Sequence, residues 1–528
     1  MPWLKVASLD ELQHRPIVLK HHPKQIAVFH VDGSLYAIDN RCPHEGYPLA
    51  AGHVSNECVL TCNWHNWKFR LDTGECLIGG DDVRSYPTKV EAGHAWVDVA
   101  EPPPEETLQR ILSGLKGAFD DRDFGRICRE IARLHYFGLD PVDSVRTALN
   151  WAHDRLEFGT THAIAAAADW LHLADSYKDD FEKRLICLSE AVDHLADDTL
   201  RRPQYAYADP GEEPFERAAF LAAVEREEAH RVEAMIARAL SEGAHWRDLE
   251  EAFTAAAFAH YNDFGHSVIY VLKTGELVAA LGPSVERPLL LALARHLCYT
   301  TREDLLPEFK DYGPTLSMLQ RSTSSPDLNG EPGVPFPATT SRALEWVHTS
   351  LTKYDVKRVY DRLLEALSLN LLSYDVRFGA AYDGPVSQNV GWLDFTHGIT
   401  MSNAARKLCS RYPQFWQTAL AQMACFLGRN HDFIDRGVDI NAWAIGDAAE
   451  FFGQVHQRLF DHGYSDPIFS VHLLKTSLAV AGELETASDS CRRALLAALN
   501  RFLGSPLKTK HVRRTARQSI SLVARDFV

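Results

Sequence analysis

The chain contains 528 residues, of which 46% are hydrophobic, so it has ample apolar material for one or more buried cores. Its formal net charge of −16 argues against a phosphate-binding surface, because nucleic-acid binding draws on clustered Lys and Arg. The N-terminal residues contain no apolar run followed by a cleavage site, and no later run of about eighteen uncharged apolar residues could span a bilayer. Outside one segment the ten cysteines are scattered singly, as is typical of reduced thiols in a cytosolic protein. We therefore expect a globular cytoplasmic protein that binds neither nucleic acid nor membranes.

Alternating apolar and polar residues in the first part of the chain predict short β-strands. The clearest strands cover residues 25–30 and 34–39, and Asp32-Gly33 between them is typical of a hairpin turn. Further short strands are expected at residues 69–71, 75–77 and 95–99. Residues 1–100 are thus predicted to form a small antiparallel all-β domain.

Two short segments of this domain each contain one cysteine and one histidine. Cys42-Pro-His44 is followed, after seventeen residues, by Cys62-Asn-Trp-His65. A [2Fe-2S] cluster with two thiolates on one iron and two imidazoles on the other needs two loops that each give one Cys and one His. Cys42 and Cys62 are therefore expected to bind one iron, and His44 and His65 the other.

A zinc ion is the rival ligand, because a Cys and a His from each of two loops also make a tetrahedral set. The flanking residues favour the cluster. Gly46 and Gly52 suit tight loops, and Trp64 and Trp67 can shield the sulfur atoms.

The motifs C-P-H-x-G and C-x-W-H resemble those of the Rieske domain of soluble ferredoxins and aromatic-ring oxygenases. Rieske domains of respiratory complexes carry a disulfide between the two loops, but residues 45–47 and 66–68 contain no cysteine here. The resemblance therefore implies the soluble branch, which delivers electrons to another site, with a reduction potential in the lower part of the Rieske range.

A proline segment separates this domain from the rest of the chain. Three consecutive prolines cannot continue a strand ladder, so residues 101–106 are predicted to form a linker. After it, apolar residues recur at intervals of three and four, which predicts helices. A stretch rich in Ser, Pro and Gly at residues 321–340 divides the helical region into two halves, residues 107–320 and 341–528. The predicted fold class is a multidomain protein, with a small all-β domain followed by a large all-α domain.

The two helical halves resemble each other in sequence. The matching segments are residues 260–274 and 462–476, residues 287–297 and 493–503, and, at a different offset, residues 161–164 and 396–399. We therefore expect an internal duplication. Equivalent histidines would then face one another across a pseudo-twofold interface, where helix bundles commonly bind metals.

A single histidine on a helix is more often a surface or core residue than a metal ligand. The paired segments raise six histidines above that expectation, namely His162, His260, His266, His397, His462 and His472. Because imidazole suits iron, we predict that four of them, His162, His266, His397 and His472, bind a non-haem iron. Glu227-x-x-His230 lacks the second Glu-x-x-His that a di-iron site needs, and is interpreted as a solvated helix face.

The helical region resembles the questin oxidase-like family in the segments Phe264-Gly-His-Ser-Val-Ile-Tyr270 and Asp466-Pro-Ile-Phe-Ser-Val-His472. This resemblance implies an oxygenase or oxidase that acts on an apolar, aromatic or polyketide-like molecule. An ordinary ring-hydroxylating oxygenase α subunit is the alternative. Its N-W-(x)n-D-x-x-H-x4-H motif is matched only in part, by Asn150-Trp151 with Glu157 and His162, and by Asp394 with His397.

The two expected iron sites predict a Rieske-dependent oxidoreductase, which passes electrons from the cluster to a His-ligated iron and oxidises a small apolar molecule with O2. No Gly-x-Gly-x-x-Gly nucleotide motif occurs, so an NAD(P)H-dependent reductase or a ferredoxin must donate electrons as a separate partner. Head-to-tail homo-oligomers are compatible with this path. The alternatives are an electron-transfer protein or a redox sensor whose helical domain docks a partner.

Overall fold

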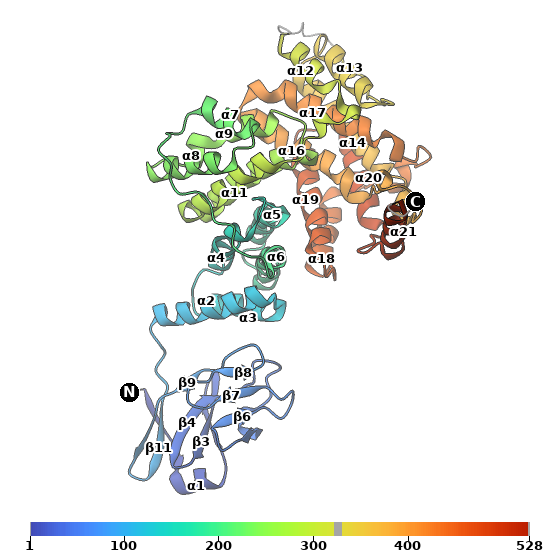
Figure 1. Cartoon of the computed structure of the whole chain (residues 1–528). Helices are drawn as coiled ribbons and strands as arrows, with labels where there is room; N and C mark the ends of the chain where they lie inside the picture. The colour runs from blue at the N-terminus through green and yellow to red at the C-terminus, as the bar shows by residue number, and fades with distance from the viewer. Residues whose placement is uncertain (1, 322–329, 526–528) are drawn as a thin grey trace. The chain divides into compact units, whose positions relative to one another are not determined.

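The computed structural model describes residues 2–321 and 330–525 (Figure 1). The chain divides into two compact units; the first ends at Pro141, and the second begins at Val142. Each unit is described by itself below.

Three small antiparallel sheets form most of the first unit. One contains β1 (Trp3–Ser8), β11 (His94–Asp98) and β10 (Thr88–Glu91) in that order. The second contains β2 (Ile17–His21), β3 (Lys24–Val31), β4 (Ser34–Asp39) and β9 (Ser85–Tyr86). The third contains β5 (His53–Val54), β6 (Val59–Thr61), β7 (Lys68–Arg70) and β8 (Cys76–Ile78). Asp32 and Gly33 join β3 to β4 with positive φ angles of 50° and 81°, as a tight hairpin turn requires. The small antiparallel β domain is confirmed.

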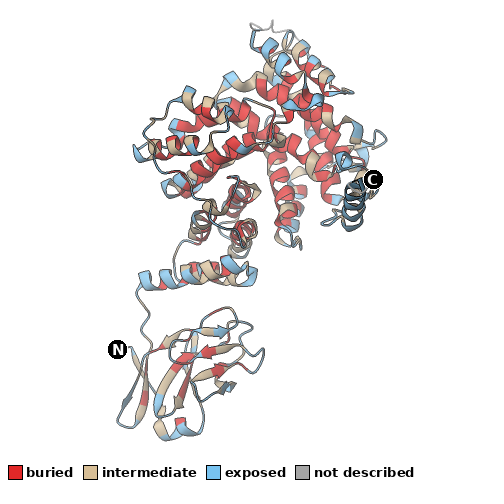
Figure 2. Ribbon diagram, viewed as in Figure 1, coloured by how far each residue is buried: buried red, intermediate tan, exposed pale blue. Residues whose placement is uncertain are grey.

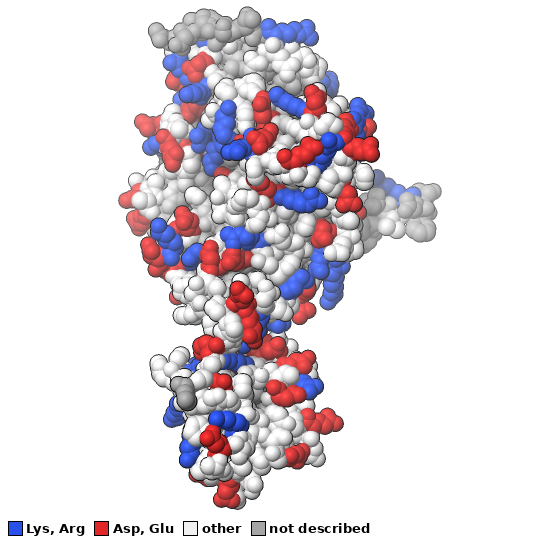
Figure 3. Space-filling view, turned by 90° about the vertical axis from the view of Figure 1, so that its left-hand side faces the viewer, with Lys and Arg blue, Asp and Glu red and all other residues white. Residues whose placement is uncertain are grey.

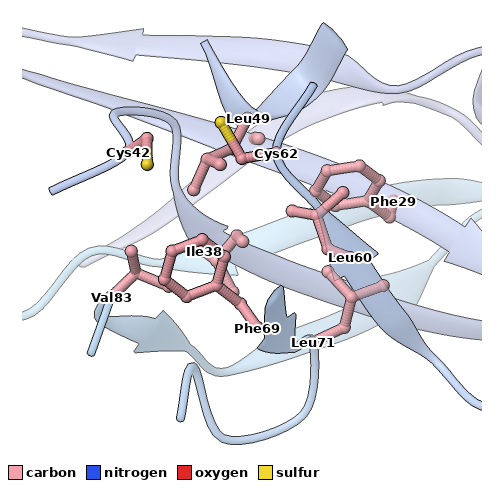
Figure 4. Close-up of a cluster of buried hydrophobic side chains, with 10 residues drawn as sticks. Phe29, Ile38, Cys42, Leu49, Leu60, Cys62, Phe69, Leu71 and Val83 are labelled. Atoms are coloured by element: carbon pink, nitrogen blue, oxygen red, sulfur yellow. The ribbon is translucent and has the colours of Figure 1, made fainter. Parts of the chain in front are cut away.

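A hydrophobic cluster fills the space between the second and third sheets. Strand residues that alternate inward, such as Phe29, Ile38 and Leu60, are at most 2% exposed. Cys42 and Cys62 belong to this cluster, and Figure 4 shows their sulfur atoms close to Leu49. The loops that carry the two cysteines are therefore anchored on the domain core.

The first unit continues beyond the predicted linker. Pro104 begins α2 (Pro104–Asp121), since a proline in the first helical turn loses no hydrogen bond. A second helix, α3 (Phe124–Tyr136), follows it. Asp81 is 1% exposed and forms ion pairs with two arginines of α3. Its Oδ1 atom lies 3.0 Å from Nε of Arg126, and its Oδ2 atom pairs with Nε of Arg129. This pairing holds α3 against the β8–β9 connection, so the compact unit extends to Pro141 and not to the expected boundary at residue 100.

The second unit is helical. Its helices are α4 (Asp143–Ala152), α5 (His162–Ser176), α6 (Phe181–Thr199), α7 (Arg217–Glu225), α8 (Ala229–Ser241), α9 (Trp246–Phe258), α10 (His266–Leu281), α11 (Glu286–Tyr299), α12 (Tyr312–Arg321), α13 (Thr340–Leu351), α14 (Val356–Leu372), α15 (Val376–Ala380), α16 (Trp392–Arg411), α17 (Trp416–Arg429), α18 (Ala448–Phe460), α19 (Pro467–Leu484), α20 (Asp489–Gly504) and α21 (Val512–Ala524). The only extended pairing among its described residues is an isolated bridge between Tyr374 and Ile434. Of the expected irregular stretch, residues 330–339 form neither helix nor strand, and residues 322–329 lie outside the described part.

Four helices form the centre of this unit. Helix α5 packs against α10 and α19, and α16 packs against the same two helices. Residues 163–168 of α5 are all buried, and five of these six are alanines, whose small side chains allow close helix approach. Figure 2 shows that α16 and α19 are mostly buried. The predicted duplication relates α5 to α16 and α10 to α19, so under it the contact of α5 with α10 would be equivalent to that of α16 with α19.

Acidic and basic side chains are interspersed on the surface seen in Figure 3. Within the described ranges, no helix is long and apolar enough to cross a bilayer.

Candidate metal centres

The two predicted cluster loops have the same backbone geometry. In the first, the Cys42 amide donates to the Tyr47 carbonyl (2.9 Å), and the amide of Gly46 donates to the Cys42 carbonyl (2.8 Å). The second loop has the same two bonds: the Cys62 amide donates to the Trp67 carbonyl (2.8 Å), and the Asn66 amide donates to the Cys62 carbonyl (3.1 Å). Gly46 and Asn66 occupy equivalent positions with φ angles of 75° and 63°. Each loop thus curls round a buried cysteine.

The four predicted cluster residues converge between these loops. Cys42 and Cys62 are 3% and 1% exposed, whereas His44 and His65 are exposed. The Nδ1 atoms of the two histidines lie 2.9 Å apart. Two buried thiols on the inner side and two imidazoles on the outer side match the donor set of a cluster in which two cysteines bind one iron and two histidines bind the other.

Burial raises the pKa of the Cys42 thiol to about 11, so iron binding must displace a proton from this sulfur. Aromatic side chains cover the outer side. Trp67 stacks on the His44 ring at 5.0 Å, and the Trp64 indole N–H donates to Glu45 (2.8 Å). The Trp64 ring also lies 5.3 Å from that of His65, so each imidazole packs against an indole ring, which limits its rotation.

The second unit brings all four predicted histidines together, one from each central helix. His162 and His266 are the first residues of α5 and α10, while His397 and His472 lie in the second turn of α16 and α19. The Nε2 atoms of His162 and His266 are 3.0 Å apart. The ring centroids of His266 and His397 are 4.4 Å apart, and those of His397 and His472 are 5.2 Å apart. We call these four residues the histidine cluster.

Potential ligand atoms of His162, His397 and His472 all lie within 4.8 Å of one another. Burial lowers the pKa of each of the four imidazoles well below its ordinary value, so all four are neutral. A neutral imidazole has one free lone pair and is the form that binds metals.

Backbone carbonyls fix the tautomers of two members of the cluster. The Nδ1 atom of His266 donates to the carbonyl of Asp263, and that of His472 donates to the carbonyl of Ile468 (2.7 Å). The Nε2 atoms of both rings therefore carry lone pairs. That of His472 has no hydrogen-bond partner among the described residues. Outer hydrogen bonds of this kind orient histidine ligands in metal sites.

Lys475 is a member of the site that the sequence prediction did not include. Its Nζ atom lies 3.2 Å from Nε2 of His397, and burial lowers its pKa to about 7. Lys273, its counterpart in the other half, forms ion pairs with Asp169 and Glu276, both at 2.7 Å. Because Lys475 has no such carboxylate at its amine among the described residues, a large part of its population is neutral near pH 7.

A cavity of about 630 Å³ reaches the cluster at His162 and His266. Its wall also contains Tyr270, whose hydroxyl lies 3.4 Å from Nδ1 of His162, and His296 on α11. Cavities of this size bind drug-sized molecules in other proteins. A compound in this cavity would thus contact the cluster directly.

The other histidines considered from the sequence lie outside the cluster. His260 pairs with Glu225 (2.6 Å) and Asp304 (3.0 Å), and His462 pairs with Glu190 (3.1 Å). Glu227 is exposed, as expected, but it lies in the turn between α7 and α8 with a φ angle of 56° and not on a helix face.

The partial ring-oxygenase motifs do not form a site of their own. Glu157 accepts a long bond from the Tyr205 hydroxyl (3.4 Å), and Asp394 caps its own helix at the Gly391 amide (2.8 Å). These bonds direct both carboxylates to partners outside the histidine cluster, although His162 and His397 themselves belong to it.

Comparison with known proteins identifies the first part of the chain. Residues 2–87 match the family model described as the Rieske [2Fe-2S] domain. The chain is 31% identical over 103 residues to the 3-phenylpropionate/cinnamic acid dioxygenase ferredoxin subunit of Photorhabdus laumondii subsp. laumondii, a match that covers 98% of that protein and 19% of this chain. The protein of the same name from Escherichia coli (strain K12) is 36% identical over 81 residues, which cover 76% of it and 15% of this chain.

Among solved structures, the ferredoxin of carbazole 1,9a-dioxygenase from Nocardioides aromaticivorans IC177 is 27% identical, with a TM-score of 0.18. The match covers 19% of this chain and 100% of that one. Because these matches cover at most 19% of the chain, the resemblance of the helical unit to the questin oxidase-like family stays a prediction. The family match, the ferredoxin relatives and the two matched loops agree for the β domain: residues 2–87 of this chain belong to the Rieske [2Fe-2S] domain family.

Proposed function

We propose that the chain is a Rieske-dependent oxidoreductase that oxidises an apolar aromatic small molecule with O2. Cys42, Cys62, His44 and His65 hold the [2Fe-2S] cluster, and the histidine cluster of the second unit holds a non-haem iron. The observation that carries the proposal is the convergence of four neutral imidazoles from four helices onto one point beside a cavity; three of them are buried and that of His162 is half-buried.

The cluster loops receive and pass on electrons. The exposed imidazoles of His44 and His65 give a partner a short route to the irons. Cys42 and Cys62 are buried, so water does not reach their sulfur atoms. Two relatives of this domain are named as ferredoxin subunits, which supports an electron-transfer role. The electron donor is a separate NAD(P)H-dependent reductase or ferredoxin.

The histidine cluster is better suited to a metal than to core packing. Core histidines usually satisfy both ring nitrogens, since a buried polar atom without a partner costs about 1–3 kcal/mol. Here Nε2 of His472 has no partner among the described residues, and Nε2 of His266 faces another imidazole. An iron bound by these nitrogens supplies the redox chemistry that O2 activation needs.

Lys475 adjusts the charge of the site. A cation at the cluster repels a protonated amine 3.2 Å from His397. The lowered pKa of Lys475, about 7, allows the amine to lose its proton when a metal binds.

An electron-transfer or redox-sensing protein is the second candidate. It is favoured by the exposure of the imidazole edges, which suits docking of a partner, and it requires no metal in the helical unit. A ring-hydroxylating oxygenase α subunit of the ordinary kind is less suitable, because its catalytic domain contains a curved sheet whereas the described residues from 142 onward are helical.

Iron analysis combined with O2 uptake tests the proposal. The Rieske cluster supplies two irons, so the proposed enzyme contains about three per chain, whereas the second candidate contains about two. With a reductase, NADH and an aromatic compound, the proposed enzyme consumes O2 in proportion to that compound. Two irons per chain and O2 uptake independent of any aromatic compound would contradict the proposal.

A further inference from the structure

The cavity beside the histidine cluster has one wall that the proposed chemistry does not use. This wall is formed by the loop before α5 and by α11, and it contains Thr160 and His296. Neither residue belongs to the histidine cluster or to the Rieske loops. The two side chains are therefore available for a role in ligand binding.

Both side chains present a polar atom without a partner. Thr160 is 4% exposed and His296 is 7% exposed, and neither Thr160 Oγ1 nor His296 Nε2 has a hydrogen-bond partner among the described residues. An acidic atom, Oδ2 of Asp263, lies 3.4 Å from His296 Nε2 without forming a hydrogen bond to it. Buried polar atoms of native proteins are rarely left unpaired, and those that line a cavity commonly bind a ligand or water.

The wall is rigid. The Thr160 amide donates to the Ala292 carbonyl (3.1 Å), which ties the loop to α11. Gly159, with φ of 82°, allows the close approach, because a Cβ there would lie 2.1 Å from the Ala292 carbonyl oxygen and 2.6 Å from the His296 amide nitrogen. The ring of His296 packs on Tyr270, with centroids 4.8 Å apart. These contacts hold both residues in place beside the cavity.

The chemistry of the two atoms suits an uncharged hydroxyl group. Burial lowers the pKa of His296 to about 3, so its ring is neutral and can either donate or accept one hydrogen bond at Nε2. The Thr160 hydroxyl can also do both. A hydroxyl ligand, which donates one bond and accepts another, can satisfy both atoms at once.

Two exposed aromatic side chains belong to the lining of the cavity, which also contains charged residues such as Arg155 and Arg202. Phe158 and Tyr299 are 58% and 52% exposed, and their rings meet edge to face at 5.5 Å. Leu156 and Ile468 add apolar surface to the lining. Such surface is suited to a flat ring system, and it lies in the same cavity as the polar wall.

We propose that Thr160 and His296 anchor the hydroxyl group of a phenol-type aromatic substrate and thereby direct its ring toward His162 and His266. The inference rests on the proposed function, in which this cavity holds the substrate. It adds the chemical class of the substrate and two positioning residues.

Calorimetric titration of the full-length, iron-loaded chain with 2-naphthol and with naphthalene tests the anchor, under anaerobic conditions and without reductant so that no turnover occurs. Wild-type protein should bind 2-naphthol at least roughly tenfold more tightly than naphthalene, because one pair of buried hydrogen bonds separates the two ligands. Thr160→Val and His296→Asn should each reduce the affinity for 2-naphthol about tenfold and leave that for naphthalene unchanged.

Thr274→Val is the matched control. The Thr274 hydroxyl is likewise buried without a partner among the described residues, but it does not line this cavity. This variant should retain the preference for 2-naphthol. Thermal unfolding of each variant shows whether the fold is intact, and Thr160→Val alone decides the question if His296→Asn does not fold.

Equal affinities of the wild type for the two ligands would overturn the anchor. An unchanged preference for 2-naphthol in Thr160→Val would also overturn it, and this result is expected if a water molecule binds Thr160 and His296. The iron content of the same samples separates this outcome from failure of the proposed function. If the chain contains only the two irons of the Rieske cluster but still prefers 2-naphthol, the anchor is supported and the second iron site is refuted.

Discussion

The Nε2 atoms of His162 and His266 lie 3.0 Å apart, although 104 positions separate the two residues in the chain. Nδ1 of His266 donates to the Asp263 carbonyl, so Nε2 of His266 accepts and Nε2 of His162 must donate. The Tyr270 hydroxyl then supplies a bond to Nδ1 of His162 (3.4 Å). If Nε2 of His162 were to bind a metal, the proton of this ring would have to lie on Nδ1 instead, where the Tyr270 hydroxyl could accept a hydrogen bond from it.

The Rieske ligands can be tested by removing one thiol at a time. Cys42→Ser or Cys62→Ser should abolish the visible colour and the rhombic electron paramagnetic resonance signal of the reduced cluster, because a buried hydroxyl does not replace a thiolate. Cys58→Ser is the control, since the Cys58 thiol contacts the Tyr36 hydroxyl at 3.7 Å and lies outside both motifs. Retention of the signal in either ligand variant would refute the assignment. The helical unit should remain folded in all three proteins, as judged by circular dichroism.

The equivalence of Gly46 and Asn66 makes a second prediction. Asn66 has a φ angle of 63°, a conformation that glycine and asparagine tolerate and β-branched residues do not. Asn66→Gly should leave cluster content and melting temperature nearly unchanged, whereas Asn66→Val should cost about 1–2 kcal/mol of stability and reduce cluster retention. Equal melting temperatures for the two variants would show that the loop does not need the left-handed conformation.

The pairing of Asp81 with Arg126 and Arg129 should hold α3 on the β domain. Asp81→Ala leaves two guanidinium groups without their buried partner, a change that typically costs about 3–5 kcal/mol. Limited proteolysis should then cut the proline segment before α2 faster than in the wild type. Asp72→Ala is the control, because Asp72 pairs with Arg70 on an exposed surface. Equal cutting rates for both variants would argue against this role of Asp81.

Glu130 predicts a pH dependence of stability. This residue is 4% exposed, and burial raises its pKa from 4.5 to about 7 despite the nearby Arg133. A carboxyl whose pKa is higher in the folded state stabilises the fold fully below pH 4.5, and this contribution is lost as pH rises through 7. The loss is of order 3 kcal/mol. Glu130→Gln should therefore flatten the dependence of the unfolding free energy on pH over this window, as measured by denaturant unfolding. An identical slope in both proteins would contradict the raised pKa.

Much of this architecture could be predicted from the sequence. The two Cys/His motifs located the cluster loops, and the change from alternating to helical periodicity located the two kinds of structure. The domain boundary differed, because the proline segment was predicted to be a linker, whereas Pro104 is at the start of a helix that belongs to the first unit.

The histidine cluster was predicted from segments that resemble each other in the two helical halves, and the helices that carry the four histidines pack together. The surroundings of the cluster could not be predicted in the same way. Lys475 belongs to the matched segment 462–476, so the sequence pointed to its position. Whether a lysine has a carboxylate partner, however, depends on the packing of other helices. Thr160 and His296 carried no signal, because the pattern of α11 is that of an apolar helix and an unpaired buried atom is defined only in three dimensions.

The iron content of single histidine variants tests the central claim most directly. Each of four variants, His162→Ala, His266→Ala, His397→Ala and His472→Ala, should lower the iron content from about three to about two per chain. The Rieske spectrum should stay intact, because the [2Fe-2S] cluster supplies the other two irons and lies in the first unit. His260→Ala should keep about three, since His260 binds Asp304 and Glu225 outside the histidine cluster. If all four variants retain the iron content of the wild type and lose only stability, the imidazoles are core hydrogen-bonding groups and the second iron site does not exist.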